Sequence, residues 1–177
     1  MTALPKSGLL PDTHRVPDVL APDLKVVFCG TALGHRSALA KAYYANPGNL
    51  FWRALHETGL TPRRFAPQEY AGVLKLGIGL TDLCKHAFGN DADLPADAFD
   101  IAALREKIAR TRPRILAFTS KTGAASFLGK ATGDIAYGFQ PERIGRTRIY
   151  VLSSPSGHGR KYWRQDVWQA LADEVNS

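Results

Sequence analysis

Residue types that can bind and act on a small ligand gather just after the first apolar run of the chain. This run, Leu24 to Cys29, is rich in β-branched residues and predicts a buried strand. Gly30 and Gly34 bracket the short loop that follows, where a missing Cβ lets backbone amides approach a ligand. Tyr43 and Tyr44 come next and precede a new helix start. Because ligands bind at the carboxyl ends of strands in open α/β sheets, this order predicts a binding pocket.

Residues 44–52 read Tyr-Ala-Asn-Pro-Gly-Asn-Leu-Phe-Trp. They resemble Phe-Ala-His-Pro-x-Asn-x-Phe-Trp in the first motif of the mismatch-specific uracil/thymine-DNA glycosylases, a branch of the uracil-DNA glycosylase superfamily. Residues 43–47 are also similar to the Tyr-Tyr-Ala-His-Pro of the hypoxanthine-DNA glycosylase branch. The preceding loop departs from the mismatch-specific pattern, because Ala32 stands where that branch has a water-positioning asparagine. The hypoxanthine branch lacks this asparagine as well.

Residues 154–160 read Ser-Pro-Ser-Gly-His-Gly-Arg and are similar to Asn-Pro-Ser-Gly-Leu-Ser-Arg, the second motif of the mismatch-specific branch. The resemblance implies that Gly157 to Arg160 fill the gap in the duplex as a wedge, with His158 at the plug position. Ser154 stands where uracil-specific relatives have a histidine. Loop amides and the hydroxyls of Ser154 and Ser156 would therefore stabilise the departing uracil anion. Without the resemblance, this segment is a surface turn with an incidental histidine.

The resemblance implies a DNA repair glycosylase, whose target base must leave the stack before its glycosidic bond can be reached. Tyr44 is the expected stacking face for this base, and a core tyrosine is the structural alternative. The loop amides from Thr31 to His35, including those of Ala32 and Gly34, are expected to bind a base carbonyl or a water molecule.

The sugar side of the site needs a carboxylate, because alanine replaces the water-positioning side chain of the first motif. Residues 79–83 read Gly-Leu-Thr-Asp-Leu and resemble the Ala-Leu-Trp-Asp-Val segment of the hypoxanthine branch. Asp82 is therefore expected to stabilise the oxocarbenium ion or to activate water. An N-cap before a helix over residues 83–88 is the structural alternative. Asn46 and His35 flank the pocket and are the reserve candidates.

Our leading hypothesis is a glycosylase that removes uracil by monofunctional hydrolysis, with other deaminated bases as further candidate substrates. A bifunctional lyase needs an amine nucleophile, and neither of the two matching segments, residues 44–52 and 154–160, contains a lysine. The substitution at Ala32 motivates a second hypothesis, a protein of the same fold that recognises damaged DNA without cleaving it. A different nucleotide-binding α/β enzyme is disfavoured, because the phosphate-loop lysine pattern and the dinucleotide glycine fingerprint are both missing.

The net charge of +7 favours neither a nucleic-acid partner nor a merely solubilising surface, so the distribution of the charge is more informative. Basic residues crowd the last third of the chain, namely Arg143, Arg146, Arg148, Arg160, Lys161 and Arg164. We expect Arg160 and Lys161 to contact phosphates. The expected partner is uracil-containing DNA, single- or double-stranded, bound by a monomer.

The composition is that of an ordinary globular protein, since the 177 residues are 45% hydrophobic and 22% charged. No apolar run is long enough to span a membrane, and the amino terminus lacks the pattern of a signal peptide. Cys29 and Cys84 lie in apolar contexts. We therefore expect a cytoplasmic protein without a disulfide framework. The spacing of the cysteines and histidines predicts no metal site, and no cofactor is expected.

Strands that alternate with helices predict a three-layer α/β/α sandwich around a mainly parallel sheet of four or five strands. The proline-rich residues 1–22 are expected to form an extended arm over a single domain of residues 23–177. The expected elements are strand 24–29, helices 49–58 and 67–76, strand 76–80, helix 100–110, strand 114–119, helix 120–129, strand 148–152 and helix 161–175. A surface loop over 89–98 and a loop containing Gly133 and Gly138 connect them. Both motif loops should meet at the carboxyl edge of the sheet.

Overall fold

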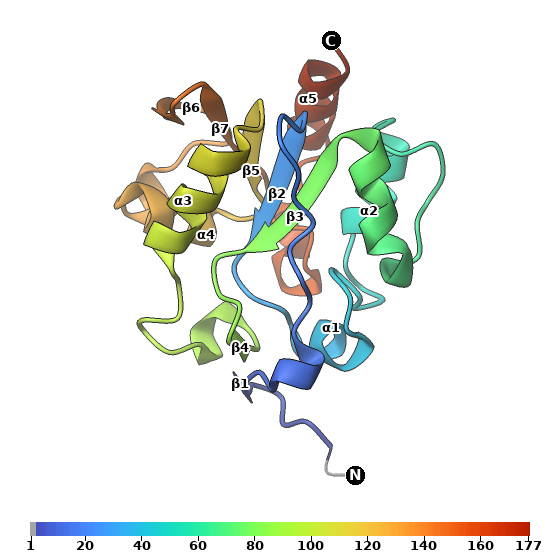
Figure 1. Ribbon diagram of the computed structural model, residues 1–177, viewed down its shortest axis with the longest axis vertical. Coiled ribbons are helices and arrows are strands. Elements are labelled where there is room, and N and C mark those ends of the chain that lie inside the picture. Colours follow the sequence, from blue (N-terminus) through green and yellow to red (C-terminus); the bar gives the residue numbers. More distant parts are fainter. Residues whose placement is uncertain (1–2) are drawn as a thin grey trace.

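A five-stranded sheet forms the middle layer of the molecule, which a computed structural model describes over residues 3–177 (Figure 1). Four strands are parallel, and the edge strand β6 runs antiparallel to β7. In order across the sheet, the strands are β3 (Ile78–Asp82), β2 (Val26–Gly30), β5 (Ile115–Phe118), β7 (Thr147–Val151) and β6 (Gly138–Ile144). The predicted fold class is confirmed.

The side chains of the central strands alternate between two cores, one on each face of the sheet. Val26 and Phe28 belong to the core beneath α2 (Phe51–Glu57) and α5 (Gln165–Asn176). The next residues along the same strand, Val27 and Cys29, belong to the core beneath α3 (Ile101–Thr111) and α4 (Lys121–Leu128). Because successive strand residues face opposite ways, a run that is apolar at every position suits a strand covered on both faces.

The ends of α3 and α4 follow from capping residues that the sequence displays. Asp100 accepts a hydrogen bond from the backbone N–H of Ala103 at 2.9 Å, and Ser120 accepts one from Gly123 at 3.2 Å. Gly129 ends α4 in the left-handed conformation, with φ of +66°. The remaining short helices are α1 (His35–Ala40) and the 3₁₀ helices η1 (Asp12–His14), η2 (Pro67–Leu76), η3 (Asp91–Asp93), η4 (Thr132–Asp134) and η5 (Gly157–Tyr162).

The segment before the first sheet strand lies along β3, which is an edge of the sheet. Val19 forms an antiparallel bridge with Leu80, through backbone hydrogen bonds of 2.8 and 2.9 Å. Farther toward the amino terminus, β1 (Gly8–Leu9) pairs with β4 (Ala87–Phe88) in a separate two-stranded sheet. The N-terminal segment therefore covers the strand that ends at Asp82 and the chain that follows it.

The segment after residue 76 differs from the prediction in two ways. Strand β3 begins at Ile78 and includes Asp82, so it starts and ends later than expected. The alternative helix over residues 83–88 is wrong, and β4 occupies its end. The reason is that pairing continues past the strand, because Leu83 and Cys84 donate backbone hydrogen bonds to the carbonyls of Gly30 and Thr31. Asp82 is therefore a strand residue and caps no helix.

The last third of the chain also differs from the prediction. The expected loop around Gly138 contains strand β6, which a turn at Gly145, with φ of +55°, joins to β7. The sequence did not indicate this edge strand, because β6 contains a proline and most of its side chains are partly exposed. The final helix begins at Gln165 instead of Lys161, because the preceding residues form η5. The buried face of α5 comprises Val167, Trp168, Leu171, Ala172 and Val175, whereas Trp163 precedes the helix and is half-buried.

Candidate functional site

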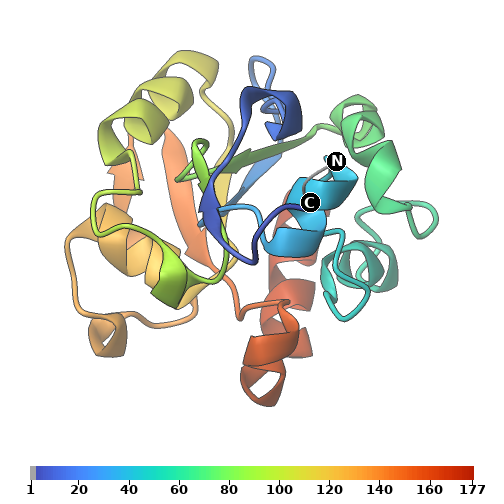
Figure 2. The same ribbon diagram turned by 90° about the horizontal axis from the view of Figure 1, so that it is seen from below.

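The parallel strands end at one edge of the sheet, and the residues at these ends form the candidate site. Gly30 ends β2, Asp82 ends β3, Thr119 follows β5 and Ser153 follows β7, and all four are buried. Figure 2 views the molecule from below, toward the end at which α1 and the N-terminal segment lie. This edge is where open α/β sheets bind ligands, as the glycine loop of the sequence predicted.

Asp82 is a buried carboxylate, and one of its two oxygens has no hydrogen-bond partner within residues 3–177. Its side chain is 5% exposed, and this oxygen is Oδ2. Oδ1 lies against Gly30, because a Cβ at this glycine would be 2.5 Å from that oxygen and 3.3 Å from the hydroxyl of Tyr44. Glycine is therefore required at the end of β2 to admit both polar groups.

The surroundings of Asp82 raise the pKa of its carboxyl toward neutral pH. The pKa of its carboxyl is raised from 3.8 to about 6, chiefly because burial disfavours the charged form; the positive charges of Lys85 and Lys107 lower it, and the negative charge of Asp18 raises it. A carboxyl with a pKa close to the working pH can exchange protons with a reacting group. Such perturbed groups at the mouth of a sheet are typical of active sites.

Tyr44 directs its hydroxyl toward the same strand ends. The hydroxyl shares a hydrogen bond of 3.3 Å with Thr119, and its pKa is raised well above 10 by burial and by Asp82, so it stays protonated. One ring face is stacked on Phe51 at 3.8 Å between centroids. Tyr44 also lines a cavity of about 430 Å³, together with Asn46, Trp52 and other residues of the first motif and the start of η2. Its role as the stacking face for a base stays a prediction.

The reserve candidates Asn46 and His35 each have a structural partner. Asn46 is exposed, and its Oδ1 accepts the backbone N–H of Gly48 at 2.9 Å. The Nδ1 of His35 donates to the carbonyl of Pro5 at 2.7 Å. These contacts hold the first motif and the N-terminal segment in place. Of the three predicted catalytic residues, the local geometry therefore favours Asp82.

The glycine loop is anchored at its start. Thr31 donates from its hydroxyl to Asp91 at 2.5 Å, and the half-buried Ala32 packs against a small cluster that includes Cys84. Gly34 is exposed and precedes α1. The loop that was predicted to bind the base thus lies between the end of β2 and the chain after β3.

The second motif meets the first at this end of the molecule. The backbone N–H of Leu50 donates to the carbonyl of Pro155 at 2.8 Å, and Nη2 of Arg160 donates to the carbonyl of Gly48 at 3.1 Å. Ser154 and Ser156 join their hydroxyls at 3.1 Å, and Ser156 caps η5 by accepting from Gly159. The expected meeting of the two motif loops is confirmed.

The tip of the second motif lies free of the protein core. Gly157, His158, Arg160 and Lys161 are exposed along η5. These are the residues that the sequence assigned to the wedge and to phosphate contacts. Their exposure suits that assignment, which remains a prediction.

Sequence reasoning missed two features that shape the site, the residue Thr119 and a charged cluster around Asp18. Thr119 ends a predicted strand, and the tendency of strand ends to line a site could have marked it. Asp18 pairs with Lys85 at 3.0 Å and with Lys107 at 2.7 Å, and it accepts from Thr81 at 2.8 Å. No local pattern signals this cluster, because its members are far apart in the sequence and the fold alone brings them together.

Within residues 3–177, no cluster of three or more metal-binding side chains is found. Over the same range, no helix has the length and apolar character needed to cross a membrane.

Comparisons with known proteins agree with this geometry. The sequence model of the Uracil DNA glycosylase superfamily matches residues 17–172. The solution NMR structure of a proposed uracil DNA glycosylase from Methanosarcina acetivorans has a TM-score of 0.61 to this chain, at 20% sequence identity. The match covers 93% of this chain and 98% of that one. At this identity the structural match concerns the fold, whereas the family match includes both motif loops and Asp82.

Proposed function

This chain belongs to the uracil DNA glycosylase superfamily, and we propose that it removes uracil from DNA by monofunctional hydrolysis of the N-glycosidic bond. The observation that carries the proposal is the carboxylate of Asp82, which is buried beside Gly30 with one unpartnered oxygen. The superfamily acts on DNA, whereas the choice of uracil and the hydrolytic step are our inference from the motif residues and this carboxylate.

In the proposed reaction, the deoxyuridine leaves the stack and its base lies against Tyr44. The bond between C1′ and the base nitrogen breaks, and the electron pair leaves with the base. Asp82 stabilises the positive charge on the sugar and accepts a proton from the water that adds to C1′. Backbone amides of the glycine loop and the hydroxyls of Ser154 and Ser156 stabilise the anionic base, which is then protonated by solvent.

The surroundings of two lysines support hydrolysis over lyase chemistry. Lys85, three residues after Asp82, is paired with Asp18 and donates to the hydroxyl of Tyr43 at 2.9 Å. Lys121 at the start of α4 lies over the ring of Tyr137, 4.4 Å from its centroid. An amine nucleophile must be free to attack C1′, and these two ammonium groups are engaged elsewhere.

One observation favours the second candidate, a protein that recognises damaged DNA without cleaving it. Asp82 is nearly covered in the free protein, and Ala32 supplies no side chain that could hold a water molecule. Hydrolysis therefore requires the glycine loop or Tyr44 to move when DNA binds. A protein in which this movement does not occur would bind DNA and release no base.

The test is a strand-cleavage assay with end-labelled oligonucleotides that contain a single uracil, hypoxanthine or mismatched thymine. We expect the uracil strand to break after alkali treatment and to stay intact without it. Breakage without alkali would identify a lyase. Tight binding with no product from any of the three bases would establish the non-cleaving alternative.

The same assay has an expected pH dependence. The ionised form of Asp82 is the active one and its pKa is raised to about 6, so the single-turnover rate should rise about tenfold per pH unit below 6 and level off above it. Saturating protein at each pH removes the contribution of DNA binding. A rate that increases toward acid pH would contradict this role for the carboxylate.

We expect Arg160→Ala to weaken DNA binding uniformly across sequences. Arg160 is exposed at the tip of the second motif, and removing one phosphate contact should reduce the slope of log affinity against log salt by about one unit. Arg110→Ala, at an exposed position near the end of α3, is the matched charge control and should keep the slope of the unmodified protein. Equal slopes for both variants would exclude η5 from the DNA contact.

A further inference from the structure

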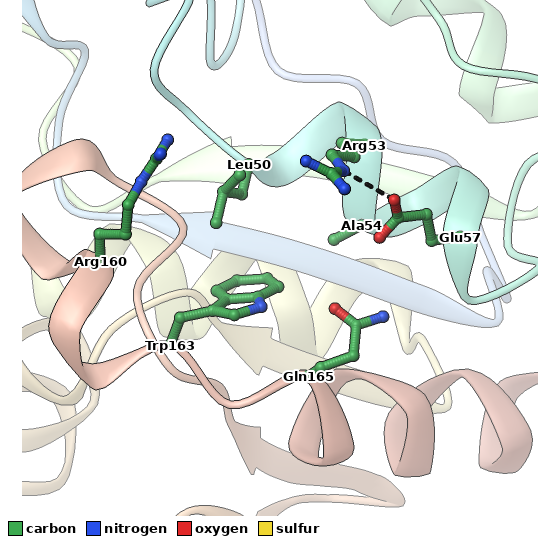
Figure 3. Close-up of a pocket in the computed structure, with 7 residues that line it drawn as sticks. All are labelled: Leu50, Arg53, Ala54, Glu57, Arg160, Trp163 and Gln165. Carbon is green, nitrogen blue, oxygen red and sulfur yellow. Dashed lines mark hydrogen bonds and ion pairs between the residues drawn. The ribbon is translucent and has the colours of Figure 1, made fainter.

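A second cavity, of about 450 Å³, lies between α2 and the segment that runs from η5 to the start of α5 (Figure 3). Leu50 and Ala54 line it on the α2 side, and Trp163 lines it on the opposite side. It shares no lining residue with the cavity beside Tyr44, and Asp82 does not reach it. The proposed glycosylase chemistry therefore leaves this cavity unused.

Trp163 offers an aromatic surface that the other two tryptophans of the chain cannot offer. Its indole packs against Trp168 with ring centroids 5.3 Å apart, so it is supported from one side. Trp52 and Trp168 are 3% and 0% exposed, whereas Trp163 is half-buried and borders the cavity. A fixed and accessible indole is a surface on which any nucleobase can stack.

The rim of the cavity adds polar groups suited to a nucleotide. Arg160 is directed to the Gly48 carbonyl and has no ion pair with a carboxylate in the described part of the chain, residues 3–177. Arg53 is paired with Glu57 at 2.6 Å, which fixes its guanidinium along the opposite rim. Gln165 brings an amide that can donate to or accept from a base edge. The uncompensated charge at the rim is thus positive.

Arg160 connects this cavity with the proposed DNA surface, because the same side chain belongs to the second motif loop and to the rim. A strand whose phosphate lies at Arg160 has its neighbouring sugar and base next to Trp163. The volume also suits this occupant, since sites for small organic groups typically measure about 300–1,000 Å³.

We propose that this cavity binds one unstacked nucleobase of a DNA strand outside the glycosylase pocket. Trp163 stacks on the base, and Arg160 holds the adjacent phosphate. The inference rests on the proposed function in one respect, namely that DNA is the partner. It requires no base removal and no particular base.

The test compares two uracil-free ligands of equal length and equal charge, an oligothymidylate and an oligomer of abasic spacer units. Fluorescence anisotropy of labelled oligomers gives the affinity ratio of the two. The unmodified protein should favour the thymidylate, and Trp163→Leu should lose about tenfold of this preference while it binds the spacer oligomer unchanged. Tyr70→Leu, which replaces a half-buried aromatic residue outside the cavity, is the control and should keep the preference. An undiminished preference in Trp163→Leu would overturn the proposal.

A second measurement guards against misfolding of the leucine variant. Tryptophan emission of the unmodified protein should be quenched by the thymidylate and not by the spacer oligomer, and the quenching should vanish in Trp163→Phe. Absence of quenching in the unmodified protein would also overturn the proposal. Neither oligomer contains uracil, so a negative result here would not contradict the proposal that the protein releases uracil. A protein that shows the quenching but releases no uracil would contradict only the proposed function.

Discussion

Asp82→Asn should lower the single-turnover rate of uracil release by a factor of about 10² to 10⁴, with DNA affinity nearly unchanged. The amide keeps the shape of the side chain and can neither accept a proton from water nor balance a positive charge on the sugar. Affinity is set by groups at the surface, and Asp82 is buried beneath them. Rates from rapid mixing at saturating protein, together with anisotropy titrations, separate the two effects. A fully active Asp82→Ala protein would exclude the role.

The same variant should be more stable than the unmodified protein at alkaline pH. The folded-state pKa is raised from 3.8 to about 6, so Asp82 favours the folded state below about pH 4, and this contribution is lost as the pH rises through 6. Above that pH, the buried charge costs up to about 3 kcal/mol. The melting temperature of Asp82→Asn should exceed that of the unmodified protein at pH 8, and the gap should close toward pH 4. A purely structural carboxylate would give the opposite result, a less stable variant.

Gly30→Ala should reduce uracil release at least about a hundredfold and lower the free energy of unfolding by about 1–3 kcal/mol. The added methyl would lie 2.5 Å from Oδ1 of Asp82 and 3.3 Å from the hydroxyl of Tyr44, within the central layer of the sheet. Relief of the contact requires Asp82 or Tyr44 to leave its position, so the rate should fall even in molecules that remain folded. Assays well below the melting temperature, with melting curves from circular dichroism, measure both quantities.

Gly133→Ala is the matched control for this substitution. A Cβ at Gly133 meets no atom within 4 Å, and this residue lies in the exposed η4. It should leave both the rate and the melting curve unchanged. If Gly30→Ala behaved in the same way, the close packing of Gly30 against Asp82 would have no functional consequence, and the search for the catalytic group would return to Asn46 and His35.

The sequence allowed the buried strands and the capped helices to be predicted. Strands β2 and β5 are apolar at nearly every position because helices cover both of their faces, and such runs are recognisable without a structure. Asp100 and Ser120 are capping residues whose contacts are local, so the starts of α3 and α4 could also be predicted. Contacts between residues that are close in the sequence can therefore be predicted without a structure.

The features that could not be predicted depend on distant partners or on solvent. Strand β6 lies at the edge of the sheet, where its exposed side chains follow no apolar alternation. The raised pKa of Asp82 arises from burial, which outweighs the lowering by Lys85 and Lys107, and from the charge of Asp18; these three charges lie on different segments of the chain. Trp163 is only half-buried because it precedes α5, which begins at Gln165, four residues later than expected.

The N-terminal segment has a further consequence for the molecule as a whole. Strand β3 would otherwise present a row of unpaired backbone groups, which is a template for association with the strands of other chains. The bridge from Val19 to Leu80 occupies part of that row, and the contact of Asp18 with Lys85 holds the segment in place. The segment around Val19 thus covers part of this sheet edge and leaves fewer backbone groups free to pair with other chains. Its removal would expose the strand that carries Asp82 at its end, so solubility and the geometry of the site would be lost together.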